Sequence, residues 1–185
     1  MYLKAVLRSI FIYILLVSQA STAELSPKKE HLKAALTFNF INFTHWPEVA
    51  FSDQNMTYNI CFAGDNAYSE KFNIISKQSI RGRKLHLIQL DVKSENISLE
   101  LCQVLFVQFV NLDKSFSVLE QAKSQPILTI SETENIRDTD KINAMITFIN
   151  NNDRVGFTIN RAIANQAGIK FSSKMLRLAV KVVEG

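Results

Sequence analysis

The two cysteines are the residues of this 185-residue chain whose chemistry is easiest to anticipate. Cys61 lies in the apolar run TYNICFA and Cys102 begins the apolar run CQVLFV, so both are expected in buried strands. Such strands are often neighbours in doubly wound sheets, which would bring the two sulfur atoms within bonding distance. A disulfide is one interpretation, and two buried free thiols that pack as small apolar groups are the other. A role for these two cysteines as a redox switch is a further hypothesis, which goes beyond the presence of a disulfide.

Motifs for the common classes of catalysis are missing from the sequence. It has no GxGxxG or GxxxxGK[ST], which argues against a nucleotide-dependent enzyme, and no GxSxG or HExxH. His31, His45 and His86 show no metal-ligand spacing and are expected to be structural or on the surface. Two cysteines are too few for a four-thiolate zinc site. We therefore predict no catalytic residue, no metal and no cofactor.

Residues 1–23 resemble a secretory signal peptide. Lys4 and Arg8 provide a positive start, IFIYILLV is an apolar core, and the segment ends in small residues. A membrane anchor is the alternative, but the apolar stretch is short and Arg8 interrupts it. Cleavage would leave one domain, residues 24–185, without a stable membrane anchor. It would also lower the net charge from +4 to +2, which removes the main support for a nucleic-acid partner.

Export changes the expectation for the cysteines, because disulfides form and persist in oxidising compartments. An even number of cysteines in an exported chain favours the Cys61–Cys102 bridge over two free thiols. In the chain-entropy model, closing a loop of roughly 40 residues stabilises the fold by about 4 kcal/mol.

Helical and strand patterns alternate along the rest of the chain, and the elements that they predict position the two cysteines. The order predicts a single α/β domain with a mixed sheet, helices on both faces and an antiparallel C-terminal hairpin. In sequence order, the predicted elements are a helix from Ser26-Pro27 to just before Trp46-Pro47, a strand over 57–63, a short helix over 68–76, strands over 84–90 and 102–107, a helix over 112–123, a strand over 126–130, a brief helical or irregular segment over 132–137, hairpin strands over 142–149 and 154–159, a helix over 161–167 ending at Gly168, and a last helix capped by Ser172.

The first and last helices each show an apolar face at helical spacing. For the last helix it comprises Met175, Leu176, Ala179, Val182 and Val183. For the first helix it comprises Leu32, Ala35, Leu36, Asn39, Phe40 and Phe43. The aromatic residues of the first helix are expected in the core, and an exposed partner surface that includes Phe38 is the alternative.

Four further residues invite a ligand-binding interpretation. Asp65 follows a predicted strand end, where α/β proteins often bind ligands, although an Asp that forms the turn is the simpler interpretation. Arg154, Phe157 and Asn160 lie close together in sequence. Strand packing of Phe157 and capping of the next helix by Asn160 are the simpler expectation.

Short motifs, each weak alone, form an ordered set along essentially the whole chain that would remain after cleavage. They are LKAAL, NF, F and WP within residues 32–47, ICFAGD at 60–65, CQVLFV at 102–107, PILTIS at 126–131, RVGFTIN at 154–160, AGI at 167–169, SSKML at 172–176 and LA at 178–179. This set resembles the YfiR family of small exported bacterial proteins. One departure precedes the hairpin, where the family usually has a Gly-Gly-Met-Ile stretch and this chain has Asn143-Ala144-Met145-Ile146.

The resemblance implies a non-catalytic periplasmic regulator. Such proteins bind the periplasmic part of a membrane-anchored diguanylate cyclase and hold it inactive, which limits cyclic-di-GMP signalling and biofilm formation. The resemblance also implies that Cys61 and Cys102 form a structural disulfide, but it carries over no partner-binding residues. The alternative is a periplasmic small-molecule binding module that uses the turn at Gly64 to Asn66 and serves another membrane sensor or receptor. A homodimer remains open.

Overall fold

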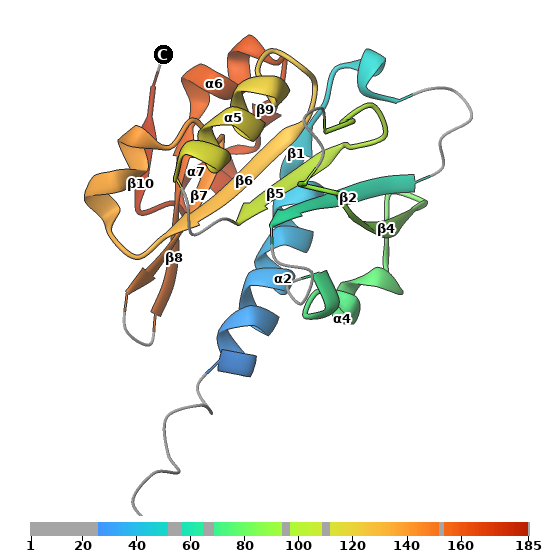
Figure 1. Ribbon diagram of the computed structural model, residues 1–185, viewed down its shortest axis with the longest axis horizontal. Helices are drawn as coiled ribbons and strands as arrows, with labels where there is room; N and C mark the ends of the chain where they lie inside the picture. The colour runs from blue at the N-terminus through green and yellow to red at the C-terminus, as the bar shows by residue number, and fades with distance from the viewer. Residues whose placement is uncertain are drawn as a thin grey trace, which may run out of the picture.

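An eight-stranded mixed sheet crosses the molecule and carries helices on both faces (Figure 1), in a computed structural model that describes residues 26–51, 57–64, 69–93, 97–108, 112–151 and 154–184. The predicted single-domain α/β architecture is confirmed. The elements are α2 (Ser26–Phe43), β1 (Thr44–His45), η1 (Glu48–Ala50), β2 (Thr57–Gly64), α4 (Asn73–Ser76), β3 (Ser79–Ile80), β4 (Arg83–Gln89), β5 (Val104–Gln108), α5 (Leu112–Ala122), β6 (Leu128–Thr133), η2 (Ile136–Lys141), β7 (Ile146–Asn151), β8 (Arg154–Asn160), α6 (Arg161–Gln166), β9 (Lys170–Phe171), α7 (Ser173–Leu176) and β10 (Lys181–Val183).

The strands lie in the order β10-β8-β7-β6-β5-β2-β4-β3. The pairs β7–β8 and β3–β4 are antiparallel, and all other neighbours in this sheet are parallel. The predicted antiparallel hairpin is therefore confirmed. β1 and β9 form a separate two-stranded antiparallel sheet.

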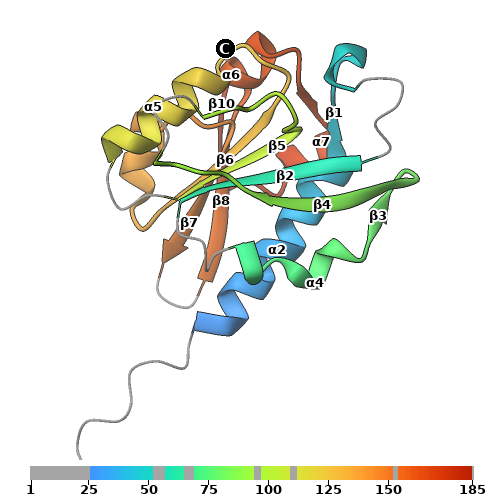
Figure 2. The same cartoon turned by 45° about the vertical axis from the view of Figure 1, so that its right-hand side comes forward.

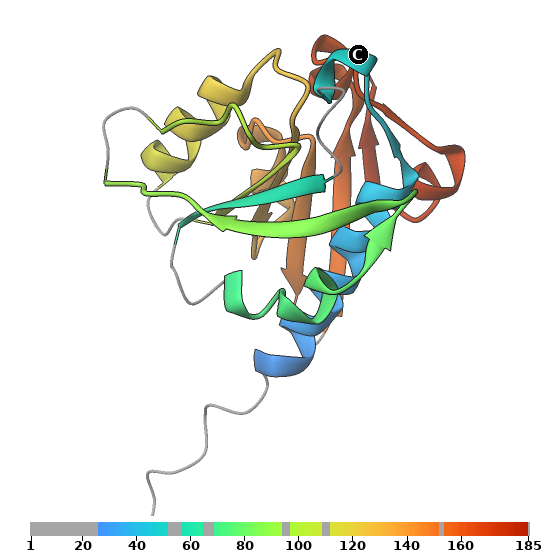
Figure 3. The ribbon, with the colours of Figure 1, turned by 90° about the vertical axis from the view of Figure 1, so that its right-hand side faces the viewer.

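Each face of the sheet carries its own apolar layer. Helices α2 and α4 lie side by side over one face, and α5 covers the other (Figures 2 and 3). On the α2 face, Phe106 from β5 stacks between Phe62 and Phe148, with ring centroids 5.8 and 6.1 Å away. Phe40 of α2 packs edge-on against Phe157 at 4.7 Å. Fully burying one such ring contributes about 1.5–3 kcal/mol, so these rings hold α2 to the sheet.

The buried face of α2 differs from the predicted one. Phe40 is buried as expected, but Leu32 is 45% exposed and Ala35 and Asn39 also face solvent. The residues actually buried are Glu30, Lys33, Ala34, Thr37, Phe40 and Ile41. The first turns of the helix lie over polar side chains of the sheet, and turning Lys33 toward them gives the largely buried Glu132 carboxylate an ion-pair partner.

The predicted C-terminal helix is wrong beyond its first turn. Ser172 caps it as expected, since its hydroxyl accepts from the backbone N–H of Met175, but α7 ends at Leu176. Val182 and Val183 instead lie in β10, which pairs in parallel with β8. Branched side chains favour strand geometry, and β8 would otherwise leave one edge of hydrogen-bonding groups unpaired.

The remaining differences concern element boundaries. Within the short helix predicted over 68–76, residues 69–70 are helical, a turn follows at 71–72, and α4 completes it. The brief segment predicted over 132–137 becomes the end of β6 followed by η2. Cys102 lies two residues before β5 and does not open it. α6 ends as predicted, with Gly168 at a φ of +69°.

Candidate functional site

Three neighbouring strands end in polar residues on the face that α2 covers. They are Gln108 of β5, Glu132 of β6 and Asn150 of β7. Each follows a run of buried apolar residues, and the alternation along the strands turns these three side chains toward α2. The Nε2 of Gln108 donates to Oε1 of Glu132 at 2.6 Å, and the Nδ2 of Asn150 donates to Oε2 at 3.4 Å. A polar row thus crosses the carboxyl edge of the sheet, where α/β folds commonly bind ligands.

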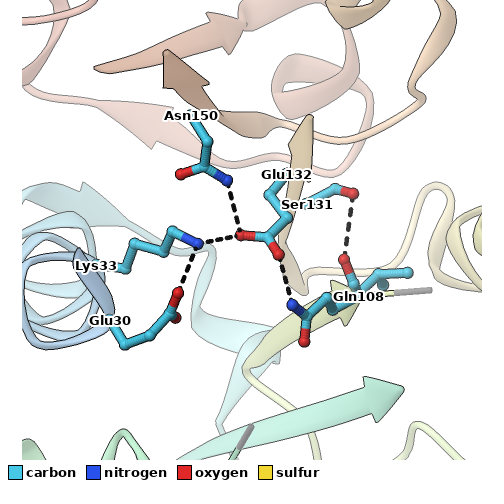
Figure 4. A network of polar contacts seen from close by, with 7 residues as sticks. Glu30, Lys33, Gln108, Ser131, Glu132 and Asn150 are labelled. Atoms are coloured by element: carbon cyan, nitrogen blue, oxygen red, sulfur yellow. Dashed lines mark hydrogen bonds and ion pairs between the residues drawn. The ribbon is translucent and has the colours of Figure 1, made fainter. Parts of the chain in front are cut away.

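The first half of α2 closes over this row with a charged pair (Figure 4). The Nζ of Lys33 lies 2.5 Å from Oε2 of Glu132 and 3.1 Å from Oε1 of Glu30. The Lys33 side chain is only 4% exposed, and the two carboxylates are 11% and 14% exposed. One ammonium group therefore serves two carboxylates that are largely shielded from bulk water.

This polar cluster (Glu30, Lys33, Gln108, Glu132 and Asn150) holds more acceptors than donors. Its formal charge is −1, because two carboxylates face one ammonium group. Oε2 of Glu30, Oε1 of Gln108 and Oδ1 of Asn150 are buried without a hydrogen-bond partner among the described residues. Buried acceptors of this kind are usually satisfied by ordered water or by a donor on a ligand. The cluster is thus chemically suited to hold donor groups.

Cys61 and Cys102 form a disulfide in the structure, with Cα atoms 5.8 Å apart. Both residues are buried in the apolar layer beneath α5, on the opposite face from the polar cluster. β2, which carries Cys61, and β5, which Cys102 precedes, are neighbours as the sequence pattern indicated, and Cys61 lies opposite Leu105 of β5. One side-chain hydrogen bond of Asn59 adds to this link, because its Nδ2 donates to the Leu101 carbonyl at 2.7 Å. The disulfide therefore ties the loop before β5 to β2.

The other residues considered from the sequence do not assemble into one site. Arg154 is exposed, whereas Phe157 is buried in the core on the α2 face of the sheet. The side chain of Asn160 accepts from the N–H of Ile163 at 3.1 Å, so it caps α6 as the simpler interpretation predicted. Asp65 lies outside the described residues.

The histidines and Phe38 follow the simpler expectation. His31, His45 and His86 are exposed and lie on three separate elements, α2, β1 and β4. Phe38 is half-buried and packs against the core. Within the described ranges, no group of three or more His, Cys, Asp and Glu side chains is placed to hold a metal ion.

Comparison with known families identifies a match over most of the chain. Residues 30–180 match the model of the family described as YfiR/HmsC-like. The chain belongs to this family. The YfiR-like family is one of periplasmic, regulatory and non-catalytic proteins. No curated protein matches the chain.

Sequence reasoning missed the polar cluster of this YfiR-like chain. Two signals could have found it: the charged pair Glu30 and Lys33 at an i, i+3 spacing, with Lys33 inside the motif LKAAL, and Glu132 directly after the strand pattern PILTIS. The predicted signal peptide, residues 1–23, lies outside the described residues. In the part of the chain that is described, no helix is both long and apolar enough to span a bilayer.

Proposed function

We propose that this chain is an exported repressor of a membrane-anchored diguanylate cyclase, and that it acts by binding the periplasmic part of the enzyme. The observation that carries the proposal is the family match over residues 30–180. Two features support it. The N-terminal 23 residues have the pattern of a cleavable export signal. The Cys61–Cys102 bridge suits an oxidising compartment.

The mechanism is a shift between two conformations of the cyclase. A regulator that contacts the inactive conformation more tightly than the active one lowers the active population without chemistry of its own. To move such an equilibrium from 1:99 to 99:1, the regulator must prefer the inactive conformation by about 10⁴-fold. A protein surface can supply this preference without a catalytic group or cofactor.

Deletion and complementation test the proposal. In the native bacterium, deleting the gene should raise cyclic-di-GMP and biofilm, and the full chain should restore both to the wild-type level. A chain that starts at Glu24, without the export segment, is the matched control and should fail to restore them. Unchanged cyclic-di-GMP in the deletion strain would refute the proposal. Full restoration by the control would refute the periplasmic site of action.

A small-molecule binding module is the second candidate, and the three unpartnered acceptors of the polar cluster favour it. A ligand that binds only the folded chain raises its melting temperature. Screening the oxidised protein against cationic and hydroxyl-rich metabolites tests this role. A shift that disappears in Glu132→Gln, while the fold is retained, would assign the ligand to the cluster.

A further inference from the structure

A groove lies at the β10 end of the sheet, on the face opposite α2. Its volume is about 300 Å³, and it is lined mainly by Glu134, Ile136, Ile149, Arg154, Gly156 and Val180. The residues come from the segment after β6, from the β7–β8 hairpin and from the chain just before β10. None of them belongs to the polar cluster or to the disulfide.

Gly156 opens this groove. It lies directly opposite Ile149 in the hairpin, and a Cβ placed on it would lie 3.0 Å from Cγ2 of Val180. Any larger side chain would therefore occupy the space in which the groove now lies. The motif RVGFTIN thus combines two roles, because Phe157 fills the core on one face while Gly156 leaves a hollow on the other.

The floor and rim of the groove expose apolar surface. Val180 is 61% exposed and Ile136 is 42% exposed, and Leu178, two residues before Val180, is 68% exposed. β10 is the outermost strand of the sheet, so its outer edge pairs with no other described strand. Val180, which lines the groove, leads directly into β10, so an extended segment that crosses the groove can continue onto this open edge and add main-chain hydrogen bonds there.

One free charge of each sign lines the groove. Neither Arg154 nor Glu134 forms an ion pair or a hydrogen bond with another residue that the structure describes. Lys181, which begins β10, is by contrast already paired with Asp140 at 2.7 Å. A binding partner can therefore neutralise Arg154 and Glu134 without breaking an existing interaction.

We propose that this groove binds an extended segment of the periplasmic part of the cyclase, one that carries a large apolar side chain between an acidic and a basic residue. The apolar side chain would enter above Gly156, the acidic residue would pair with Arg154 and the basic residue with Glu134. A polypeptide fits better than a small molecule, because Leu178 and the outer side of Val180 lie beyond the hollow and only a longer partner would cover them. The inference rests on the proposed function.

Site-specific photo-crosslinking in the native bacterium tests it. A benzoyl-phenylalanine probe replaces Val180 in the full chain, and a matched probe replaces Ile74, which is 55% exposed on α4 over the opposite face. The Val180 probe should yield an adduct that mass spectrometry identifies as a diguanylate cyclase, and the Ile74 probe should not. Adding Arg154→Glu should lower the adduct yield about tenfold, as expected when a rim charge is reversed.

A repression assay gives a second, independent readout. Gly156→Ile fills the groove, and Val180→Glu places a charge in it, at an exposed position where the fold should tolerate it. Both variants should leave cyclic-di-GMP as high as in the deletion strain while the chain stays folded by circular dichroism. Ile74→Glu is the control and should repress normally.

The outcomes separate this inference from the proposed function. Adducts with the cyclase from the Ile74 probe alone, or normal repression by both groove variants, would overturn the groove while leaving the repressor role intact. Adducts between two copies of the chain through Val180 would overturn it in favour of a homodimer. If the deletion strain keeps normal cyclic-di-GMP and no cyclase is captured, the proposed function fails and the inference fails with it.

Discussion

Replacing Lys33 with Met tests whether the buried ion pair holds α2 on the sheet. The Lys33 side chain is 4% exposed and contacts both Glu30 and Glu132. Met preserves the length and packing of the side chain but removes the ammonium group that contacts both largely buried carboxylates. Breaking a buried pair in this way costs about 3–5 kcal/mol, a large part of the roughly 5–15 kcal/mol that stabilises a domain.

Lys123→Met is the matched control. Lys123 pairs with Glu120 at the same i, i+3 spacing and at 3.2 Å, but its side chain is 53% exposed. An exposed pair contributes about 0–1 kcal/mol, so this variant should unfold almost like the wild type. Both variants remove an i, i+3 ion pair, but the pair of Lys33 is buried and Lys33→Met also removes the contact with Glu132 of the sheet.

Urea unfolding of the oxidised proteins measures the difference. We expect the free energy of unfolding of Lys33→Met to fall by about 3–5 kcal/mol, with a slope close to that of the wild type. A loss within about 1 kcal/mol of the Lys123→Met value would refute the reasoning. It would mean that the carboxylates are neutral or hydrated once the ammonium group is removed.

Three further predictions concern stability. Replacing both Cys61 and Cys102 by Ala should lower the free energy of unfolding by about 4 kcal/mol, which is the chain-entropy value for a separation of 41 residues. Reducing the wild type with dithiothreitol should lower its free energy of unfolding equally. Equal denaturant midpoints before and after reduction would contradict this prediction. Gly64→Ala should cost at least about 2 kcal/mol, because φ is +149° and the new Cβ would lie 1.9 Å from a carbonyl oxygen of β5, and a melting temperature equal to that of the wild type would be the contrary result. Asn160→Ala should cost about 1 kcal/mol through the loss of the α6 cap, measured by thermal unfolding, whereas Asn160→Asp should retain most of the stability.

Local sequence patterns predicted the central strands and the helix caps well. β5 is apolar on both faces because helices cover both faces of the sheet there, and this covering appears in the sequence as an uninterrupted apolar run. The hairpin followed from a loop that is too short for a crossover, and the caps at Asn160 and Ser172 followed from residue type. Such features depend on residues within a few positions of each other.

The errors arose where distant segments decide the structure. In a segment this short, the apolar pattern at Val182 and Val183 fits a helical face and a strand equally well. The strand forms because it pairs with the open edge of β8. The buried face of α2 was predicted wrongly because the prediction used only the spacing of apolar residues. The polar row on the sheet made burial of Lys33 more favourable than burial of Leu32.

By itself, the sequence determined the α/β class, the central strands, the caps and the family, since each depends on composition, local order or an ordered set of motifs. Only the tertiary structure brought Lys33 to Glu132, 99 positions apart, and placed Gly156 beneath Val180. Pairwise contact between distant residues depends on strand order and on the rotation of α2, neither of which a local pattern encodes. For that reason the polar cluster and the groove can be recognised only in the tertiary structure.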